Sequence, residues 1–194
     1  MPISKEQFKQ FTAKYSPLVK WLFESNQIYT NIDKTIRWCL VWDDNTAITA
    51  AVNRETNIIS VNLAFVNEAY NSNRLYDIEH FLLHEMRHVY QHIQIKKYEN
   101  KENIVGDKYI KQWIKEGSNY IPSVDKKGKE NIEYFKQDCE LDAYAFSFAI
   151  MHIKHHGIYD SLLYMPEIYK TELKEEFNSV FKDFLEEYKP QEYN

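Results

Sequence analysis

Four histidines recur at every fourth position of one short segment, and they are the residues of this chain best placed to do chemistry. They are His80, His84, His88 and His92, within the stretch HFLLHEMRHVYQH. On a helix, each step of four residues turns by 400° and climbs ~6 Å, so only neighbouring histidines can share one metal ion. Of the three neighbouring pairs, His84 and His88 alone have a glutamate directly after the first member. That pair is therefore the first candidate for a metal site.

The pair and its glutamate form the pattern HEMRH, in which two imidazoles on one helix face can ligate zinc. Glu85, one position round the helix, can then reach a metal-bound water as a general base. Zinc lowers the pKa of such a water, so the carboxylate can take its proton as the water attacks a carbonyl. The alternative is an exposed histidine-rich helix face that binds no metal. Apolar neighbours such as Leu82 and Val89 argue against it, since a chance cluster of polar groups would be costly to bury.

A catalytic zinc site usually has three protein ligands, so a third residue is needed. The segment CELDAYAF, residues 139–146, offers candidates on a second predicted helix. Glu140 lies ~200° round that helix from Asp142 and ~160° from Asp138, so only one of these carboxylates can meet the two histidines. Cys139 is a chemical rival, because a thiolate binds zinc well. The residues alone leave Glu140 and Cys139 both open.

The combination of HExxH with a later helix of the form Glu-x-x-Ala-(Asn/Asp)-x-Phe resembles the gluzincin-type metallopeptidases. The likeness is strongest to the small ImmA/IrrE-like proteins and to related metallopeptidases of phages and mobile elements, some of which carry Arg and Gln as HEMRHVYQ does. The matching residues are His84, Glu85, His88, Glu140, Ala143 and Phe146. The resemblance implies a minimal zincin scaffold with one Zn²⁺ ion. It also implies that His84, His88 and Glu140 are the ligands and Glu85 the catalytic base.

The sequence departs from that family at Tyr144, where an Asn or Asp often orients a zinc-binding histidine. The resemblance then implies that Asp142 or a backbone carbonyl takes over that task. Tyr144 could stabilise an oxyanion or be a core tyrosine whose hydroxyl bonds to backbone. Gln91 could bond a ligand carboxylate or a substrate, or simply pack two helices. Arg87 could pair with Asp142 or Glu140, or form an ordinary surface salt bridge.

The first part of the chain predicts a helix followed by a small sheet. Ser4 is a suitable helix start, and Pro17 is expected to bend or restart that helix. From residue 35 the segments TIRWCLVW, AITAAV and NIISVNL are rich in β-branched and aromatic residues, which predicts a small antiparallel sheet. NIISVNL could be an edge strand on which a peptide substrate docks by β-addition. Its apolar alternation would equally serve core packing.

Helices dominate the rest of the prediction. Asp77 is expected to cap a long helix from about Ile78 to Tyr98 that carries the histidines. Further helices are expected over residues 107–117, 131–157 and 166–188. A loop containing Pro122 and Gly128 should separate the first two of these. Gly157 and Pro190 are expected to stop the last two helices, and Pro166 to open the final one.

The composition narrows the class of protein. The 194 residues are 44% hydrophobic, which suits a single domain over residues 1–194. The net charge is −5 without a basic block, which argues against nucleic-acid binding. No run approaches the ~20 apolar residues that span a bilayer. Cys39 and Cys139 match no CxxC spacing and suit a reducing cytoplasm.

Taken with the resemblance, the sequence predicts an α+β, minimal zincin-like fold that is helix-rich, with a small antiparallel sheet before the HExxH helix. The favoured function is a cytoplasmic, zinc-dependent metallopeptidase acting on a peptide or protein substrate, without a nucleic-acid or membrane partner. A second hypothesis is a non-catalytic zincin-fold binding or regulatory protein of a phage or mobile element that keeps the metal for its structure. The sequence specifies neither the substrate nor the oligomeric state.

Overall fold

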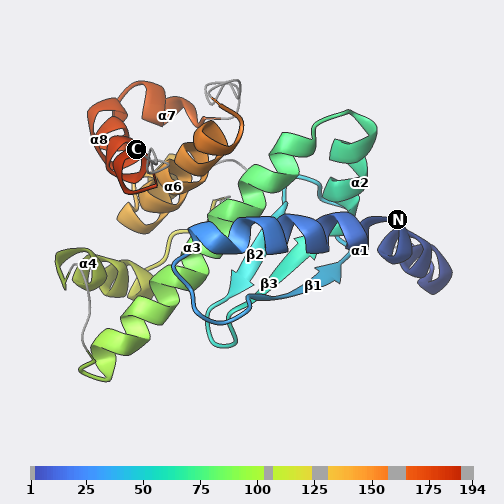
Figure 1. The fold of residues 1–194 in the computed structure, drawn as a ribbon, viewed down its shortest axis with the longest axis horizontal. Coiled ribbons are helices and arrows are strands. Elements are labelled where there is room, and N and C mark those ends of the chain that lie inside the picture. The colour runs from blue at the N-terminus through green and yellow to red at the C-terminus, as the bar shows by residue number, and fades with distance from the viewer. Residues whose placement is uncertain (1–2, 103–106, 124–130, 157–164, 189–194) are drawn as a thin grey trace, which may run out of the picture. The chain divides into compact units, whose positions relative to one another are not determined.

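The computed structural model confirms a helix-rich α+β fold with one small sheet (Figure 1). It describes residues 3–102, 107–123, 131–156 and 165–188. The chain divides into two compact units, Met1–Tyr90 and Gln91–Asn194. The expectation of a single domain over residues 1–194 therefore stays a prediction.

The positions of Gly128, Gly157 and Pro190 lie outside the described residues. No described helix is both long and apolar enough to cross a membrane.

The first unit opens with helix α1, Lys5–Asn26, whose start matches the expectation. Ser4 and Gln7 form a capping box, in which each side chain accepts a hydrogen bond from the other residue's backbone N–H. Pro17 lies inside the helix and does not restart it. One turn of 3₁₀ helix, η1 (Gln27–Tyr29), follows directly.

The sheet contains β1 (Arg37–Val41), β2 (Ala50–Asn53) and β3 (Ile58–Asn62) in the order β1-β3-β2. β2 is antiparallel to β3, as expected for neighbours joined by a short turn, but β1 runs parallel to β3. The prediction of a wholly antiparallel sheet was therefore wrong for β1. The reason is the crossover after β1. The chain leaves room for one strand beside β1 and forms β2 at the opposite edge, and β3 then fills the place between them, antiparallel to β2 and parallel to β1. β3 is the middle strand, so the idea that NIISVNL is an edge for substrate docking was also wrong. The core alternative holds, since Ile59 and Val61 are fully buried.

The side chain of Asn62 secures this topology at the end of β3. Its Oδ1 accepts hydrogen bonds from the backbone N–H groups of Asp43 and Ala64, both at 3.0 Å. Its Nδ2 donates to the carbonyl oxygens of Asn45 at 3.2 Å and Ile48 at 2.8 Å. Three of these partners belong to the segment that crosses from β1 to β2. The fourth starts the next helix, so one buried amide holds the crossover and caps that helix.

Helix α2, Leu63–Asn71, was not predicted, because NEAYNSN within and after it suggested a break. Helix α3 follows as Leu75–Glu99 and begins three residues before the expected Ile78. Asp77 consequently lies in its first turn instead of capping it, and its Oδ2 accepts a hydrogen bond from Arg74 Nη1 at 3.0 Å. The long histidine-bearing helix is thus confirmed with a corrected start, and it continues from the first unit into the second.

All the regular elements in the described part of the second unit are helices. Its helices after α3 are α4 (Asp107–Ser118), α5 (Ile132–Phe135), α6 (Asp138–Lys154), α7 (Glu167–Lys170) and α8 (Lys174–Glu187). The helices expected over 131–157 and 166–188 are therefore each divided in two. Every residue of α6 from Cys139 to Met151 is buried except Asp142, as the nearly all-round apolar pattern predicts. α8 packs along α6 in Figure 1, with the rings of Phe146 and Phe184 5.4 Å apart.

We expect Asn62→Ala and Asn62→Asp each to lower the free energy of unfolding by about 2–4 kcal/mol, because buried partners of the amide lose their hydrogen bonds. Asp keeps the two acceptor contacts but places a buried carboxylate oxygen against two carbonyl oxygens. Urea unfolding of each variant measures the loss. Asn53→Ala, at an exposed turn where Asn53 Oδ1 also accepts backbone bonds, is the control and should cost about 1 kcal/mol or less. A cost for Asn62→Asp no larger than that of the control would contradict this role of the amide.

Candidate metal centre

Helix α3 brings His84 and His88 together as its periodicity predicts. Their Nε2 atoms are 3.0 Å apart and their rings are nearly perpendicular, with centroids 4.6 Å apart. Both side chains are buried, at 3% and 8% exposed, and Glu85 between them is 8% exposed. An exposed histidine-rich face is therefore excluded for these residues. The helix presents two imidazoles and a carboxylate in a largely dry environment.

The separation of the two imidazole nitrogens fits a shared ion. Nitrogen ligands lie ~2.0–2.1 Å from zinc, so two of them on a tetrahedral ion are ~3.3 Å apart. The observed 3.0 Å between Nε2 atoms is within a few tenths of an ångström of that value. Without an ion, the same distance suits one ring donating a hydrogen bond to the other. Side chains at positions i and i+4 of one helix are therefore already placed to bind one metal ion.

Glu140 offers the third candidate ligand from the first turn of α6, where its side chain is fully buried. One ligand atom from each of His84, His88 and Glu140 lies within 4.8 Å of the other two. Two imidazoles and a carboxylate are a donor set that catalytic zinc sites use, with a fourth position for water. Across the described segments, this is the group of His, Cys, Asp or Glu side chains that can hold a metal ion.

Cys139, the chemical rival of Glu140, lies outside that group. Burial, and then the neighbouring carboxylates of Glu140 and Glu116, raise the pKa of the Cys139 thiol far above its ordinary range. A thiol must lose its proton to bind a metal well, so the surroundings that raise this pKa disfavour Cys139 as a ligand. Of the two alternatives that the sequence left open, the geometry favours Glu140.

Two tyrosines lie near the Glu140 carboxylate. Tyr120 Oη donates a hydrogen bond to Glu140 Oε1 at 3.0 Å, and Tyr134 is close enough to feel the Glu140 charge. Burial, followed by the nearby Glu140 charge, raises the pKa of Tyr134 well above its ordinary value. That phenol therefore keeps its proton. Sequence reasoning missed both tyrosines, because neither lies at a fixed spacing from the HExxH motif.

The start of α6 is held by Glu116, from the last turn of α4. Glu116 Oε1 accepts a hydrogen bond from the Asp138 backbone N–H at 2.9 Å, and Oε2 accepts one from that of Cys139 at 3.0 Å. A carboxylate here also complements the positive end of the helix dipole. Glu116 was missed as well. The available signal was an acidic residue in a last turn, where cations are usually favoured.

Gln91 joins α3 to α6. Its Nε2 donates to the Cys139 carbonyl oxygen at 2.9 Å and to Asp142 Oδ2 at 2.7 Å. These bonds give it the helix-packing role that was one of its two predicted uses. Contact with a ligand carboxylate or a substrate stays a prediction, as does the task of Asp142 in orienting a histidine.

Arg87 and Tyr144 each contact aromatic rings. The Arg87 guanidinium carbon is 4.3 Å from the centre of the Tyr90 ring, a cation–π distance. Tyr144 is buried, with its ring 5.9 Å from that of Phe135 and 5.6 Å from that of Tyr169. This packing agrees with the core interpretation of Tyr144. Its use as an oxyanion donor, and a salt bridge from Arg87, stay predictions.

Comparisons of the chain with protein-family models, with curated proteins and with solved structures yield no match. The case for a metal centre therefore depends on the residues themselves. Its evidence is the motif HEMRH, the spacing of its two imidazoles and the position of the buried Glu140. The resemblance to gluzincins stays a prediction.

His80, one helical step before His84, is wholly buried. Burial, and then the charge of His84, lower the pKa of His80 from 6.5 to about 3. Between those two pH values His80 is protonated in the unfolded chain but neutral in the folded chain. The stability of the fold therefore falls as the pH drops below 6.5, by about 1.4 kcal/mol per pH unit.

We expect His80→Met to remove this loss of stability at low pH, because a thioether takes up no proton in the folded or the unfolded state. Between pH 7 and pH 5, the unfolding free energy of the metal-free variant should fall by about 2 kcal/mol less than that of the metal-free parent chain. Urea unfolding at the two pH values measures the difference. His152→Gln, which removes an exposed histidine, should leave the pH dependence of the parent unchanged. An equal acid loss in the parent and in His80→Met would refute the assignment.

Proposed function

We propose that this protein is a zinc-dependent metallopeptidase that hydrolyses peptide bonds. The observation that carries the proposal is the pair of buried imidazoles 3.0 Å apart, with a buried glutamate directly after the first and the Glu140 carboxylate within reach of both. His84, His88 and Glu140 would hold the ion. Zinc in such a site supplies a water of lowered pKa and polarises the carbonyl that is attacked.

Glu85 is the proposed catalytic residue. It follows His84 on α3 and is 8% exposed, and it is not among the three side chains whose ligand atoms come together. A carboxylate in that position takes a proton from the attacking water and passes it to the departing amine. Its shielding from bulk water also strengthens its interactions with a charged reacting group.

The substrate class follows from the chemistry of the site. A metal with a single general base suits hydrolysis of an amide carbonyl, so we propose a peptide or protein substrate. The net charge of −5 gives no support for a nucleic-acid partner. Both cysteines are free thiols, one exposed and one buried. That supports a reducing compartment, and we place the protein in the cytoplasm.

Metal analysis tests the ligand set. We expect untagged protein and Glu85→Gln to carry about one zinc ion per chain, because Glu85 is not a ligand. His84→Ala and Glu140→Ala should each lose most of the zinc after dialysis. Elemental analysis of the four proteins measures this directly. An untagged parent chain that stays free of zinc after incubation with the ion would refute the metal site.

Cleavage tests the role of Glu85. We expect zinc-loaded protein to cut members of a diverse peptide library, and Glu85→Gln to slow that cleavage by about 10²–10⁴-fold. Glu99→Gln, an exposed position on the same helix, should retain full activity. Mass spectrometry of the products gives rates and cut sites. If zinc binds but no cleavage depends on Glu85, the metal serves structure alone, and the chain is the non-catalytic regulatory protein considered above.

A further inference from the structure

Tyr120 combines two properties that set it apart among the residues around Glu140. Its hydroxyl donates a hydrogen bond to Glu140 Oε1 at 3.0 Å. Its side chain is nevertheless 52% exposed, whereas Glu140 is 0% exposed. Tyr120 thus reaches from the surface of the second unit to a carboxylate that water cannot reach.

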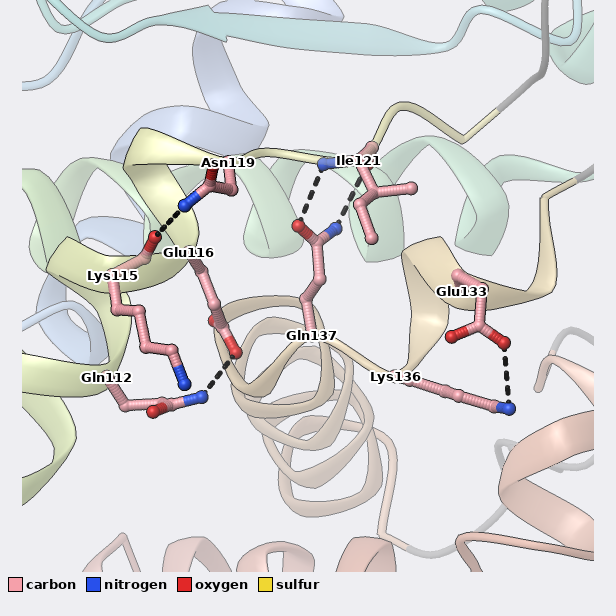
Figure 2. A pocket seen from close by; sticks show the side chains of 8 residues that line it. All are labelled: Gln112, Lys115, Glu116, Asn119, Ile121, Glu133, Lys136 and Gln137. Atoms are coloured by element: carbon pink, nitrogen blue, oxygen red, sulfur yellow. Dashed lines mark hydrogen bonds and ion pairs between the residues drawn. The ribbon is translucent and has the colours of Figure 1, made fainter.

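The segment carrying Tyr120 has no regular secondary structure, so its position depends on side-chain contacts. Gln137 supplies them on the C-terminal side. The Ile121 backbone N–H donates to Gln137 Oε1, and Gln137 Nε2 donates to the Ile121 carbonyl oxygen, both at 3.0 Å. Figure 2 shows this pair of bonds, in which a side-chain amide takes the place of a neighbouring strand. Gln137 is also the residue before α6, three positions before Glu140.

The N-terminal side of the same segment is tied to α4. Asn119 Nδ2 donates to the Lys115 carbonyl oxygen at 3.5 Å, and the Asn119 backbone N–H bonds to the Glu116 carbonyl oxygen at 2.9 Å. Gln112 Nε2 in turn donates to Glu116 Oε1 at 3.0 Å (Figure 2). The carboxylate of Glu116 binds the start of α6. Both sides of Tyr120 are therefore connected to the helix that carries Glu140.

We infer that Tyr120 is a positioning residue for the metal ligand Glu140, and that Gln137 acts through it by holding the segment that carries it. This inference rests on the proposed function, because it assigns Tyr120 a task at that zinc site. A hydrogen bond to Oε1 restricts the rotation of the carboxylate and would leave its other oxygen available to the ion. Partners of this kind commonly raise metal affinity 10- to 100-fold.

Zinc affinity tests the inference without any need for a substrate. We expect Tyr120→Phe to weaken zinc binding by 10- to 100-fold, measured by competition with a chromophoric chelator. Tyr109→Phe removes the hydroxyl of another half-exposed tyrosine, on α4, and should bind zinc like the parent chain. Because Glu140 is buried, loss of the hydroxyl should also lower the melting temperature of the metal-free protein. Circular dichroism of metal-free Tyr120→Phe should show a folded protein at the assay temperature, so that a loss of zinc affinity reports on the ligand and not on unfolding.

A double-mutant cycle tests the part played by Gln137. Gln137→Met should also weaken zinc binding. The double variant, Tyr120→Phe with Gln137→Met, should bind zinc no more weakly than the weaker of the two single variants, because both changes act on the same hydrogen bond between Tyr120 and Glu140. Full additivity of the two losses would overturn the claim that Gln137 acts through Tyr120.

The outcomes separate this inference from the proposed function. If the parent binds zinc, His84→Ala does not, and Tyr120→Phe stays within twofold of the parent, the positioning role is overturned while the metal site stands. If the parent itself binds no zinc, the metal site fails and the role of Tyr120 fails with it. A loss confined to Tyr120→Phe, with Tyr109→Phe unaffected, supports the inference.

Discussion

The free-energy cost of burying the Glu140 carboxylate is the constraint on which much of the second unit depends. An ionised carboxylate removed from water costs several kcal/mol unless new partners replace its hydration. Tyr120 brings a hydroxyl to it from a loop, and Tyr134, on α5, lies near enough for the Glu140 charge to raise its pKa. Glu116, on α4, satisfies backbone N–H groups in the same helical turn. Three segments outside α6 thus determine where one side chain lies, and a metal ion would add the positive charge that phenols cannot supply.

The parts of this arrangement that could be predicted from the sequence are those encoded by helical periodicity. The spacing of His84 and His88 needs nothing beyond a regular helix, and α3 provides one. The face on which Glu140 lies also follows from rotation along α6, whose apolar pattern predicted its burial. That Glu140, and not Cys139, would complete the ligand set does not follow from periodicity. Its prediction came from the resemblance to gluzincins and stays a prediction; the support for it is that His84, His88 and Glu140 form a group that could hold an ion.

The parts that could not be predicted depend on contacts between residues far apart in sequence. The crossover after β1 is held by Asn62, about 20 residues later, so no local pattern could reveal the parallel pairing of β1 with β3. The division of the expected 131–157 helix has a similar cause. Gln137 is extended, with φ −69° and ψ 132°, and its amide bonds to Ile121. Helix propensity is a weak preference that such tertiary contacts readily override.

This difference between local and distant contacts has a consequence for how the proposed metal site can change. The two histidines are positioned by one helix, so substitutions elsewhere in the chain should leave their mutual distance nearly constant. The carboxylate is bonded by Tyr120, and Tyr120 and the residues that hold it can vary without disturbing α3. In the proposed metallopeptidase, affinity for the ion would therefore be adjustable through the surroundings of Glu140, while Glu85 keeps its place next to His84 on the helix. An arrangement of this kind can retain catalytic geometry while metal affinity changes, because separate elements encode the two properties.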